Sequence, residues 1–208
     1  DTTVEVTTYR TEAYENGTRK PAVQYGDSLE GELTRRDFTV NAIALRLPSL
    51  EFVDPTGGIA DLESGVLRTP VTARQSFDDD PLRIMRAARF SAQLGFDVEP
   101  DVVDAMDEMA DRLEIVSAER IRAEIERLVI SRWPRRGLEL LVYTGVADVV
   151  LPELAQLRDT VDEHGRHKDV YEHTLTVLDQ AIAQETGPEG AVPAPDFVLR
   201  FAAIMHDV

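Results

Sequence analysis

The segment Asp79-Asp80-Pro81-Leu82-Arg83 combines residue types that could recognise a nucleobase. Pro81 suits the first turn of a helix, so the aspartates are expected at the helix N-terminus, where unpaired amides and the helix dipole favour negative charge. Asp80 and Arg83 are three residues apart and are therefore expected to share a face. A carboxylate beside a guanidinium matches the hydrogen-bonding edge of cytosine or adenine. The alternative is a helix whose charged face carries only ion pairs.

Such a pair could act as a protein template for two of the four bases. Cytosine and adenine carry an exocyclic amino group for the aspartate and a ring acceptor for the arginine, whereas uracil and guanine present the reverse pattern. Each hydrogen bond that a wrong base fails to make would cost about 1–3 kcal/mol. Arg86 and Arg89 continue the spacing of three along the same helix. Guanidinium groups there suit the oxygens of a triphosphate.

Three other strings accompany this helix motif. In chain order they are Arg35-Arg36-Asp37-Phe38-Thr39-Val40-Asn41-Ala42, Asp54-Pro55-Thr56-Gly57-Gly58-Ile59-Ala60-Asp61-Leu62 and Ser117-Ala118-Glu119-Arg120-Ile121-Arg122. Together the four motifs, in this order, resemble the class II nucleotidyltransferase family, which includes CCA-adding enzymes and bacterial poly(A) polymerases. The resemblance covers essentially the whole chain. It implies an enzyme that extends the tRNA 3′ end.

The resemblance implies six nucleotide-binding residues: Arg36, Asp37, Asp80, Arg83, Arg86 and Arg89. Arg36 corresponds to the family's triphosphate contact. Asp37 corresponds to the residue that meets the ribose 2′-hydroxyl and thereby helps to select ribonucleotides. Asp80 and Arg83 correspond to the pair that recognises the base, in agreement with the interpretation from the residues themselves.

Two positions leave alternatives open. The family often has Glu-Asp where this chain has Asp79-Asp80, so the orienting role of position 79 is in doubt. The pair Gly57-Gly58 resembles a flexible element that lets the head reshape between C and A addition. Two glycines after Asp-Pro are more often the signature of a simple turn.

The resemblance also implies two Mg²⁺ ions, bound by a DxD pair that follows a glycine-rich GGxVRD loop. The GGxVRD string does not occur in these residues, and Asp-x-Asp occurs only within the run Asp78-Asp79-Asp80. Two-metal catalysis needs such carboxylates, so we expect the 208 residues alone to be inactive and the Mg²⁺ of the parent enzyme to be bound mainly elsewhere. Glu5 alternates with Val4 and Val6. It is either an additional acidic residue near those metals or an exposed position of a half-buried strand.

Histidines occur only late in the chain. The segments around His173 and around His206-Asp207 resemble the start of an HD-type metal phosphohydrolase domain. The resemblance implies metal ligands at His173, His206 and Asp207, with a final aspartate beyond Val208, and a phosphatase or phosphodiesterase activity. The alternative is a set of helix-packing histidines without a metal.

The elements that must position these residues change character along the chain. We expect strands at residues 4–9, 38–47 and 50–53, with a turn at Asn16-Gly17. After Asp80 the period becomes helical, with Leu82, Met85, Ala88 and Ala92 on one stripe and Gly95 ending the helix. Further helices are expected at residues 100–113, 117–131, 134–144 and 173–183. The fold class is thus α+β, a partial antiparallel sheet followed by a mostly helical remainder.

We divide the chain accordingly into four parts. They are a partial nucleotidyltransferase head (1–64), a helical neck with the nucleotide-recognition helix (65–130), a helical body (131–163) and the start of an HD domain (164–208). The chain opens on a strand pattern without a cap and closes within an apolar helix, so we expect an interior piece of a longer protein.

Composition narrows the class of protein. The absence of cysteine leaves oxygen and histidine ligands for any metal, which favours Mg²⁺ or Mn²⁺ chemistry. The net charge of −17 argues against a non-specific nucleic-acid binder. Basic residues nevertheless gather in short clusters, of which the one at Arg132, Arg135 and Arg136 suits either a tRNA backbone or plain solvation. With no apolar span or leader, we expect a cytoplasmic protein.

These observations predict a CCA tRNA nucleotidyltransferase with tRNA, CTP and ATP as partners. They do not indicate its oligomeric state. Within the same fold the alternatives are a poly(A) polymerase or a CC- or A-adding enzyme. An HD phosphohydrolase with a regulatory nucleotide-binding module, and a helical RNA-binding scaffold without activity, are the alternatives from other classes.

Overall fold

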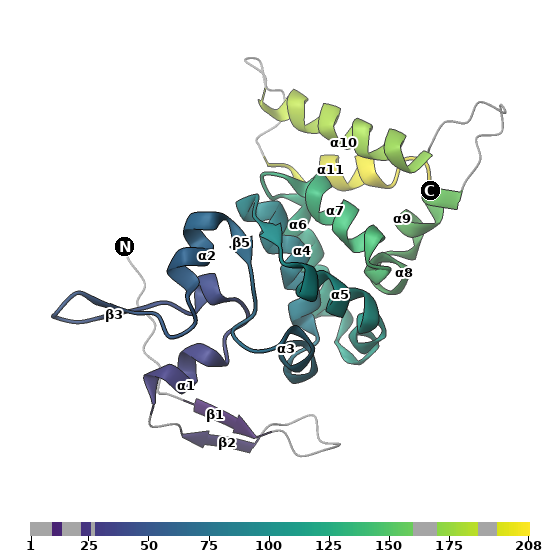
Figure 1. Cartoon of the computed structure of the whole chain (residues 1–208). Helices are drawn as coiled ribbons and strands as arrows, with labels where there is room; N and C mark the ends of the chain where they lie inside the picture. The colour runs from purple at the N-terminus through teal and green to yellow at the C-terminus, as the bar shows by residue number, and fades with distance from the viewer. Residues whose placement is uncertain (1–9, 14–21, 26–27, 160–169, 187–194) are drawn as a thin grey trace.

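The computed structural model describes residues 10–13, 22–25, 28–159, 170–186 and 195–208 of the 208-residue chain. Short two-stranded sheets and small helices occupy the first third, and helices occupy almost all of the rest (Figure 1). The predicted α+β class is confirmed. The expected strand at residues 4–9 and the turn at Asn16-Gly17 lie outside the described residues, as does Glu5.

The first third contains two antiparallel hairpins and a short parallel pair. Its strands are β1 (Arg10–Ala13), β2 (Ala22–Tyr25), β3 (Ala44–Arg46), β4 (Glu51–Val53) and β5 (Val66–Leu67), the last pairing with β6 (Asp97–Val98). Its helices are α1 (Leu29–Thr34) and α2 (Gly58–Ser64). The register of β3 and β4 sets Leu45 opposite Phe52. The predicted strand at residues 50–53 is confirmed as β4.

The predicted strand at residues 38–47 is wrong in its first half. Thr39–Asn41 forms a 3₁₀ turn, and only Ala44–Arg46 pairs as a strand. The turn is favoured by its surroundings, because the Thr39 amide donates to the Arg68 carbonyl at 2.8 Å and the Thr39 hydroxyl donates to Asp61 at 2.7 Å. β-branched residues at these positions therefore serve a long-range contact and not a ladder.

The helical remainder is built around one central helix, α4 (Leu82–Leu94). The other helices in chain order are α3 (Ala73–Asp79), α5 (Pro100–Glu108), α6 (Ala118–Val129), α7 (Pro134–Tyr143), α8 (Val146–Val150), α9 (Pro152–Gln156), α10 (Val170–Thr186) and α11 (Phe197–Ile204). The helices predicted over 117–131 and 134–144 are confirmed as α6 and α7. The one predicted over 100–113 ends early at Glu108, and Ala110–Ile115 continues as 3₁₀.

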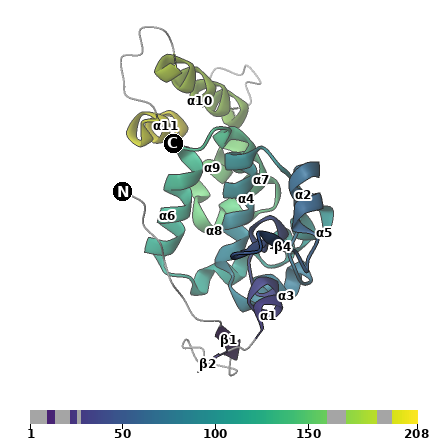
Figure 2. The same cartoon turned by 90° about the vertical axis from the view of Figure 1, so that its left-hand side faces the viewer.

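The predicted apolar stripe of α4 is confirmed. Leu82, Met85, Ala88 and Ala92 are buried, and α4 packs against both α6 and α7 (Figure 2). Gly95 ends the helix with a φ of 74°, a conformation that L side chains rarely adopt.

A second glycine, Gly137, sets the spacing between α4 and α7. A Cβ at this position would lie 2.8 Å from the Ala88 carbonyl oxygen and 2.9 Å from the Ala92 Cβ. Gly137 is unfavourable for a helix interior, so its use here reflects the close approach of the two helices.

A buried ion pair joins α11 to α10, and its arginine also binds backbone carbonyls at the end of α6. Arg200 in α11 donates to both carboxylate oxygens of Glu185 in α10 and also to the carbonyls of Val129 and Ser131 at 3.0 and 2.8 Å. Burial opposes ionisation of Glu185, but the hydrogen bonds from Arg200 and from the Asp196 amide outweigh it and lower the pKa of Glu185. Among the described helices, none is both long and apolar enough to cross a membrane.

Candidate functional site

Asp80 lies between two helices at the start of α4. It is the residue that ends α3, with an extended backbone (φ −147°, ψ 99°), and Pro81 then opens α4 in the helical region. One Asp80 carboxylate oxygen accepts the Leu82 amide at 3.3 Å. The predicted position of this carboxylate at a helix N-terminus is therefore confirmed.

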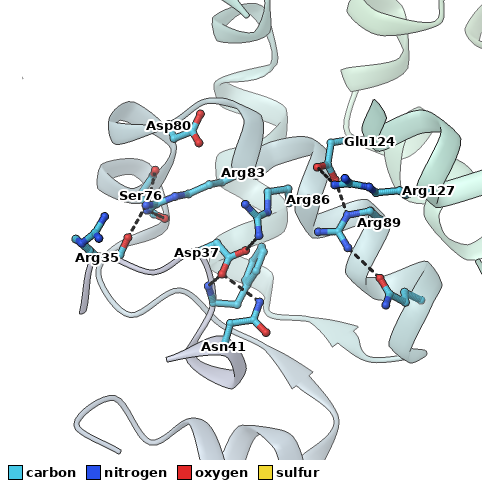
Figure 3. A network of polar contacts seen from close by, with 12 residues as sticks. Arg35, Asp37, Asn41, Ser76, Asp80, Arg83, Arg86, Arg89, Glu124 and Arg127 are labelled. Atoms are coloured by element: carbon cyan, nitrogen blue, oxygen red, sulfur yellow. Dashed lines mark hydrogen bonds and ion pairs between the residues drawn. The ribbon is translucent and has the colours of Figure 1, made fainter. Parts of the chain in front are cut away.

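The side chains of Asp80 and Arg83 do not pair, contrary to the expectation from their spacing. The expected side-chain pair fails because Asp80 precedes the helix and is not part of it. Its carboxylate instead accepts a hydrogen bond from the guanidinium of Arg120 in α6 at 3.2 Å. Arg83 donates to the Ser76 hydroxyl at 2.8 Å and to the Arg35 carbonyl, and Figure 3 shows its guanidinium turned toward both. The Arg83 backbone amide donates to the Asp80 carbonyl at 2.9 Å, but within the described residues no hydrogen bond or ion pair joins their side chains.

Arg36 is the most accessible of the predicted triphosphate contacts. It follows α1, and its side chain is 49 % exposed. Its guanidinium lies 3.7 Å from Glu32, whose carboxylate is already engaged by two hydrogen bonds from Arg35, each 2.7 Å long. Arg36 can therefore leave this distant contact at little cost, because such half-exposed ion pairs contribute at most about 1 kcal/mol.

Asp37 and Arg86 form a bridge between the segment after α1 and helix α4. Arg86 lies 2.6 Å from one oxygen of the buried Asp37 carboxylate. The other oxygen accepts the Phe38 amide at 2.9 Å and the Asn41 side-chain amide at 3.1 Å (Figure 3). The oxygen that faces Arg86 takes part in the ion pair but accepts no hydrogen bond from the described residues, so a ribose hydroxyl could donate to it while sharing it with Arg86.

Arg89 differs from the other predicted site residues because it lies in the core. Its side chain is buried and donates to Glu124 of α6 (Figure 3). It also donates to Gln93 at 2.9 Å and lies over the Phe90 ring. Burial lowers the pKa of Arg89, although Glu124 opposes the shift. The structure gives Arg89 a role in joining α4 to α6, and its guanidinium does not reach the group around Asp80.

The sequence did not predict the polar partners of Arg83 and Asp80, which are Ser76 and Arg120. Ser76 carries no signal of its own, since it is one residue of an amphipathic helix. Arg120 belongs to the Ser117–Arg122 string, so a role could have been sought for it, but its 40-residue separation from Asp80 hides the contact. The string thus supplies a side chain that holds the proposed base-reading carboxylate.

The Gly57-Gly58 turn is tightly packed. The Asp54 carboxylate accepts the amides of Gly58 and Ile59 at 2.7 and 2.9 Å, and a Cβ on Gly58 would lie 2.0 Å from the Thr39 carbonyl oxygen. Gly57 has a φ of 77°. These contacts account for both glycines as a turn with close backbone approach.

The second group of predicted site residues comes together at the end of the chain. One ligand atom from each of His173, His206 and Asp207 lies within 4.8 Å of the others. The Nε2 atoms of His173 and His206 lie 3.9 and 3.1 Å from the same Asp207 oxygen. Among the described residues this is the one group with the composition and spacing to hold a metal ion.

The hydrogen bond of His206 favours a cation at this group. Its Nδ1 lies 2.8 Å from the Ala203 carbonyl, which can only accept, so Nδ1 carries the proton. In the neutral ring, Nε2 then turns a lone pair toward the Asp207 carboxylate. Two acceptors at this distance repel one another, and either a proton on Nε2 or a metal ion between the two atoms would satisfy both.

Comparison with known proteins identifies relatives along most of the chain. Residues 1–68 match a family model described as the Poly A polymerase head domain, and residues 95–157 match one described as a probable RNA and SrmB-binding site of polymerase A. The CCA-adding enzyme of Streptococcus gordonii is 42% identical over 160 residues, which cover 76% of this chain and 40% of that protein. The A-adding tRNA nucleotidyltransferase of Deinococcus radiodurans is 39% identical over 186 residues, covering 87% and 41%.

Solved structures agree with these matches. The CCA-adding enzyme of Bacillus stearothermophilus in complex with CTP superposes with a TM-score of 0.65 and 34% identity, covering 83% of this chain and 42% of that one. A CCA-adding enzyme in complex with ATP superposes with a TM-score of 0.61 and 27% identity, covering 84% and 39%. The chain therefore spans about two fifths of the length of its relatives.

Proposed function

We propose that this chain is the nucleotide-recognising part of a CCA tRNA nucleotidyltransferase. The chain carries poly(A) polymerase head and RNA-binding domains and is homologous to CCA-adding enzymes. The whole protein would transfer CMP and AMP from CTP and ATP to the tRNA 3′ end in the cytoplasm. No nucleic-acid strand would direct the choice of base. Two of the solved relatives contain CTP or ATP, which supports these nucleotides as substrates.

The observation that carries this proposal is the exchangeable state of Asp80 and Arg83. The Asp80–Arg120 pair is open to solvent, with side chains 28 % and 54 % exposed. Such a pair contributes at most about 1 kcal/mol. A base that pairs with both side chains would gain about 1–3 kcal/mol for each contact, so it can displace the internal partners. When Arg83 binds a base, the partners that it gives up are neutral acceptors, among them the Ser76 hydroxyl and the Arg35 carbonyl.

The neighbouring residues are proposed to hold the rest of the nucleotide. Arg36 and Arg86 suit the triphosphate, because each offers several donors in a plane. Asp37 suits the ribose hydroxyl, since its carboxylate lies beside Arg86. Arg89 is left out of the proposed site because its guanidinium is held in the core.

Mg²⁺ is proposed as the cofactor of the whole protein, where it would activate the tRNA 3′-hydroxyl and neutralise pyrophosphate. The part of the chain described between residues 28 and 68 contains no group of three or more carboxylates spaced to share a metal ion. The residues described here are therefore assigned to binding the base, ribose and phosphates.

Primer extension tests the proposal. The whole protein, given a tRNA transcript that lacks its 3′ CCA, is expected to complete CCA when CTP and ATP are both present. With CTP alone it should stop after C residues, and omission of Mg²⁺ should prevent addition. Long tails made from ATP alone would instead identify a poly(A) polymerase, and addition of only C or only A would identify a partial CCA enzyme.

A second candidate function is metal-dependent phosphoester hydrolysis at His173, His206 and Asp207. Two imidazoles and a carboxylate suit divalent transition metals, and they leave coordination positions open for water and substrate. The bound metal would supply a nucleophile from water. The hydrogen bond between His206 Nδ1 and the Ala203 carbonyl would hold the ring so that Nε2 remains available as a ligand.

Metal titration separates this candidate from a set of packing histidines. Addition of Co²⁺ to the 208-residue chain should produce visible absorption bands with one ion bound per chain. We expect the His206→Gln variant to lose at least about tenfold in affinity, since one of three ligands is removed. The Glu153→Gln variant removes an exposed acidic residue elsewhere and should bind as the unmodified chain does. Equal binding by all three proteins would exclude the site.

A further inference from the structure

A cleft of about 520 Å³ lies where the end of α4, the start of α7 and the middle of α10 meet. Figure 1 shows α10 at the opposite end of the molecule from β1 and β2, and α10 contacts α7 as well as α11. The lining of the cleft combines apolar side chains and one tryptophan with three arginines and two carboxylates. α4 has 13 residues, so this end lies roughly 20 Å from Asp80. The cleft is therefore separate from the proposed nucleotide site.

Trp133 is held in this cleft with part of its ring open. The residue is 40 % exposed, and its backbone amide donates to the Ala92 carbonyl at 2.9 Å. Gly95 makes room for the ring, since a Cβ there would lie 3.0 Å from it. The indole is thus positioned by its backbone and by a glycine, while one part of its surface remains free to contact a ligand.

The arginines of the cleft are not equivalent. Arg135 contacts three carboxylates, those of Glu139, Glu172 and Asp179, which raise its pKa. Arg136 is paired with Asp97. Arg132 has no carboxylate partner among the described residues, and its guanidinium lies 4.5 Å from the centre of the Trp133 ring. Arg132 is therefore the cation of the cleft that remains available to an anion.

We propose that Trp133 and Arg132 form a stacking site for an unpaired nucleobase of RNA, with the base on the indole and its phosphate on Arg132. An aromatic platform beside a cation is the arrangement that binds single-stranded nucleic acid, and stacking contributes about 1–3 kcal/mol per base. The inference rests on the proposed function, because tRNA is the RNA that the protein would hold. It adds a contact remote from the site that reads the incoming nucleotide.

The chemistry of the cleft favours one nucleotide of a chain over a free triphosphate. Only one uncompensated arginine faces it, and the carboxylates of Glu139 and Asp179 would repel a ligand with three or four negative charges. A single base with one phosphate per residue fits this balance. The apolar side chains of Leu94, Pro134 and Ile182 complete a surface for a planar ring.

Tryptophan fluorescence provides a direct test, because Trp133 is the only tryptophan of the 208 residues. A single-stranded RNA of six nucleotides is expected to quench its emission, whereas the same backbone without bases is not. CTP and ATP should neither quench at concentrations that fill the nucleotide site nor displace the RNA. Equal quenching by the abasic backbone, or by free CTP, would overturn the inference.

Variants make the test independent of tryptophan emission. By anisotropy of a labelled six-nucleotide RNA, Trp133→Leu should weaken binding about 5–150-fold and Trp133→Phe much less, as removal of one stacked base requires. Arg132→Gln should reduce the salt dependence by about one phosphate contact. The matched control is Tyr143→Leu, which removes an exposed aromatic at the other end of α7 and should have no effect. If Trp133→Leu binds as tightly as the Tyr143 control, the inference fails.

A tRNA transcript distinguishes this failure from failure of the proposed function. Normal binding of labelled tRNA without any effect of Trp133→Leu contradicts the stacking site and leaves tRNA as a partner. Quenching by the six-nucleotide RNA with no measurable tRNA binding supports the stacking site and contradicts the choice of tRNA.

Discussion

The Asp80→Ala variant of the whole protein is expected to lose its preference for CTP and ATP over UTP and GTP. Asp80 is the only acceptor of the proposed base-reading pair, so its removal deprives cytosine and adenine of the contact to their amino groups. The loss of about 1–3 kcal/mol corresponds to a fall of roughly 5–150-fold in relative kcat/KM for the correct nucleotides. Competition between labelled CTP and UTP on one tRNA measures this ratio directly.

Arg36→Ala is the matched control for this variant. Arg36 is proposed to contact phosphate, which all four nucleotides share, so its removal should weaken every nucleotide by a similar factor and leave the ratios unchanged. If Asp80→Ala kept the normal ratios while Arg36→Ala altered them, the roles assigned to the two residues would be reversed.

The Glu124→Gln variant is expected to lower the free energy of unfolding by about 3–5 kcal/mol, the usual cost of leaving one charge of a buried pair without its partner. Glu124 and Arg89 are both less than 10 % exposed as side chains, and they join α6 to the central helix α4. Urea unfolding followed by circular dichroism measures the change. A comparable exchange in the exposed pair of Arg122 and Glu126 should change stability by less than about 0.5 kcal/mol.

A double variant separates stability from nucleotide binding. Replacing the pair by Arg89→Met and Glu124→Leu removes both buried charges together, and such exchanges are often neutral or stabilising. The double variant should therefore fold and still bind CTP, because Arg89 is not part of the proposed site. Loss of CTP binding from a stable double variant would restore Arg89 as a nucleotide contact.

The parts of the fold that could be predicted from sequence are those whose signals are local. The α4 helix was predicted with both ends because its apolar stripe, Pro81 and Gly95 all lie within the helix or next to it. The 3₁₀ turn at Thr39–Asn41 could not be predicted, because the carbonyl of Arg68 and the carboxylate of Asp61 favour it from more than 20 residues away. Short helices such as α8 and α9 are too brief to show a period.

The same division holds for the candidate sites. The residues around Asp80 were identified by type and spacing, and the cluster of His173, His206 and Asp207 by its resemblance to HD domains; the structure brings that cluster together. What the sequence could not reveal is which partner each charge takes. Asp80 pairs with Arg120 across 40 residues and Arg89 with Glu124 across 35, so both contacts depend on how α4 and α6 pack.

The central claim is that Asp80 and Arg83 exchange their internal partners for a nucleobase, and a crystal structure of the chain with bound CTP tests it most directly. We predict that the Asp80 carboxylate leaves Arg120 and accepts the cytosine amino group, while Arg83 leaves Ser76 and the Arg35 carbonyl and donates to the ring. Cytosine bound elsewhere, with Arg120 still on Asp80 and Arg83 still on Ser76, would contradict the account.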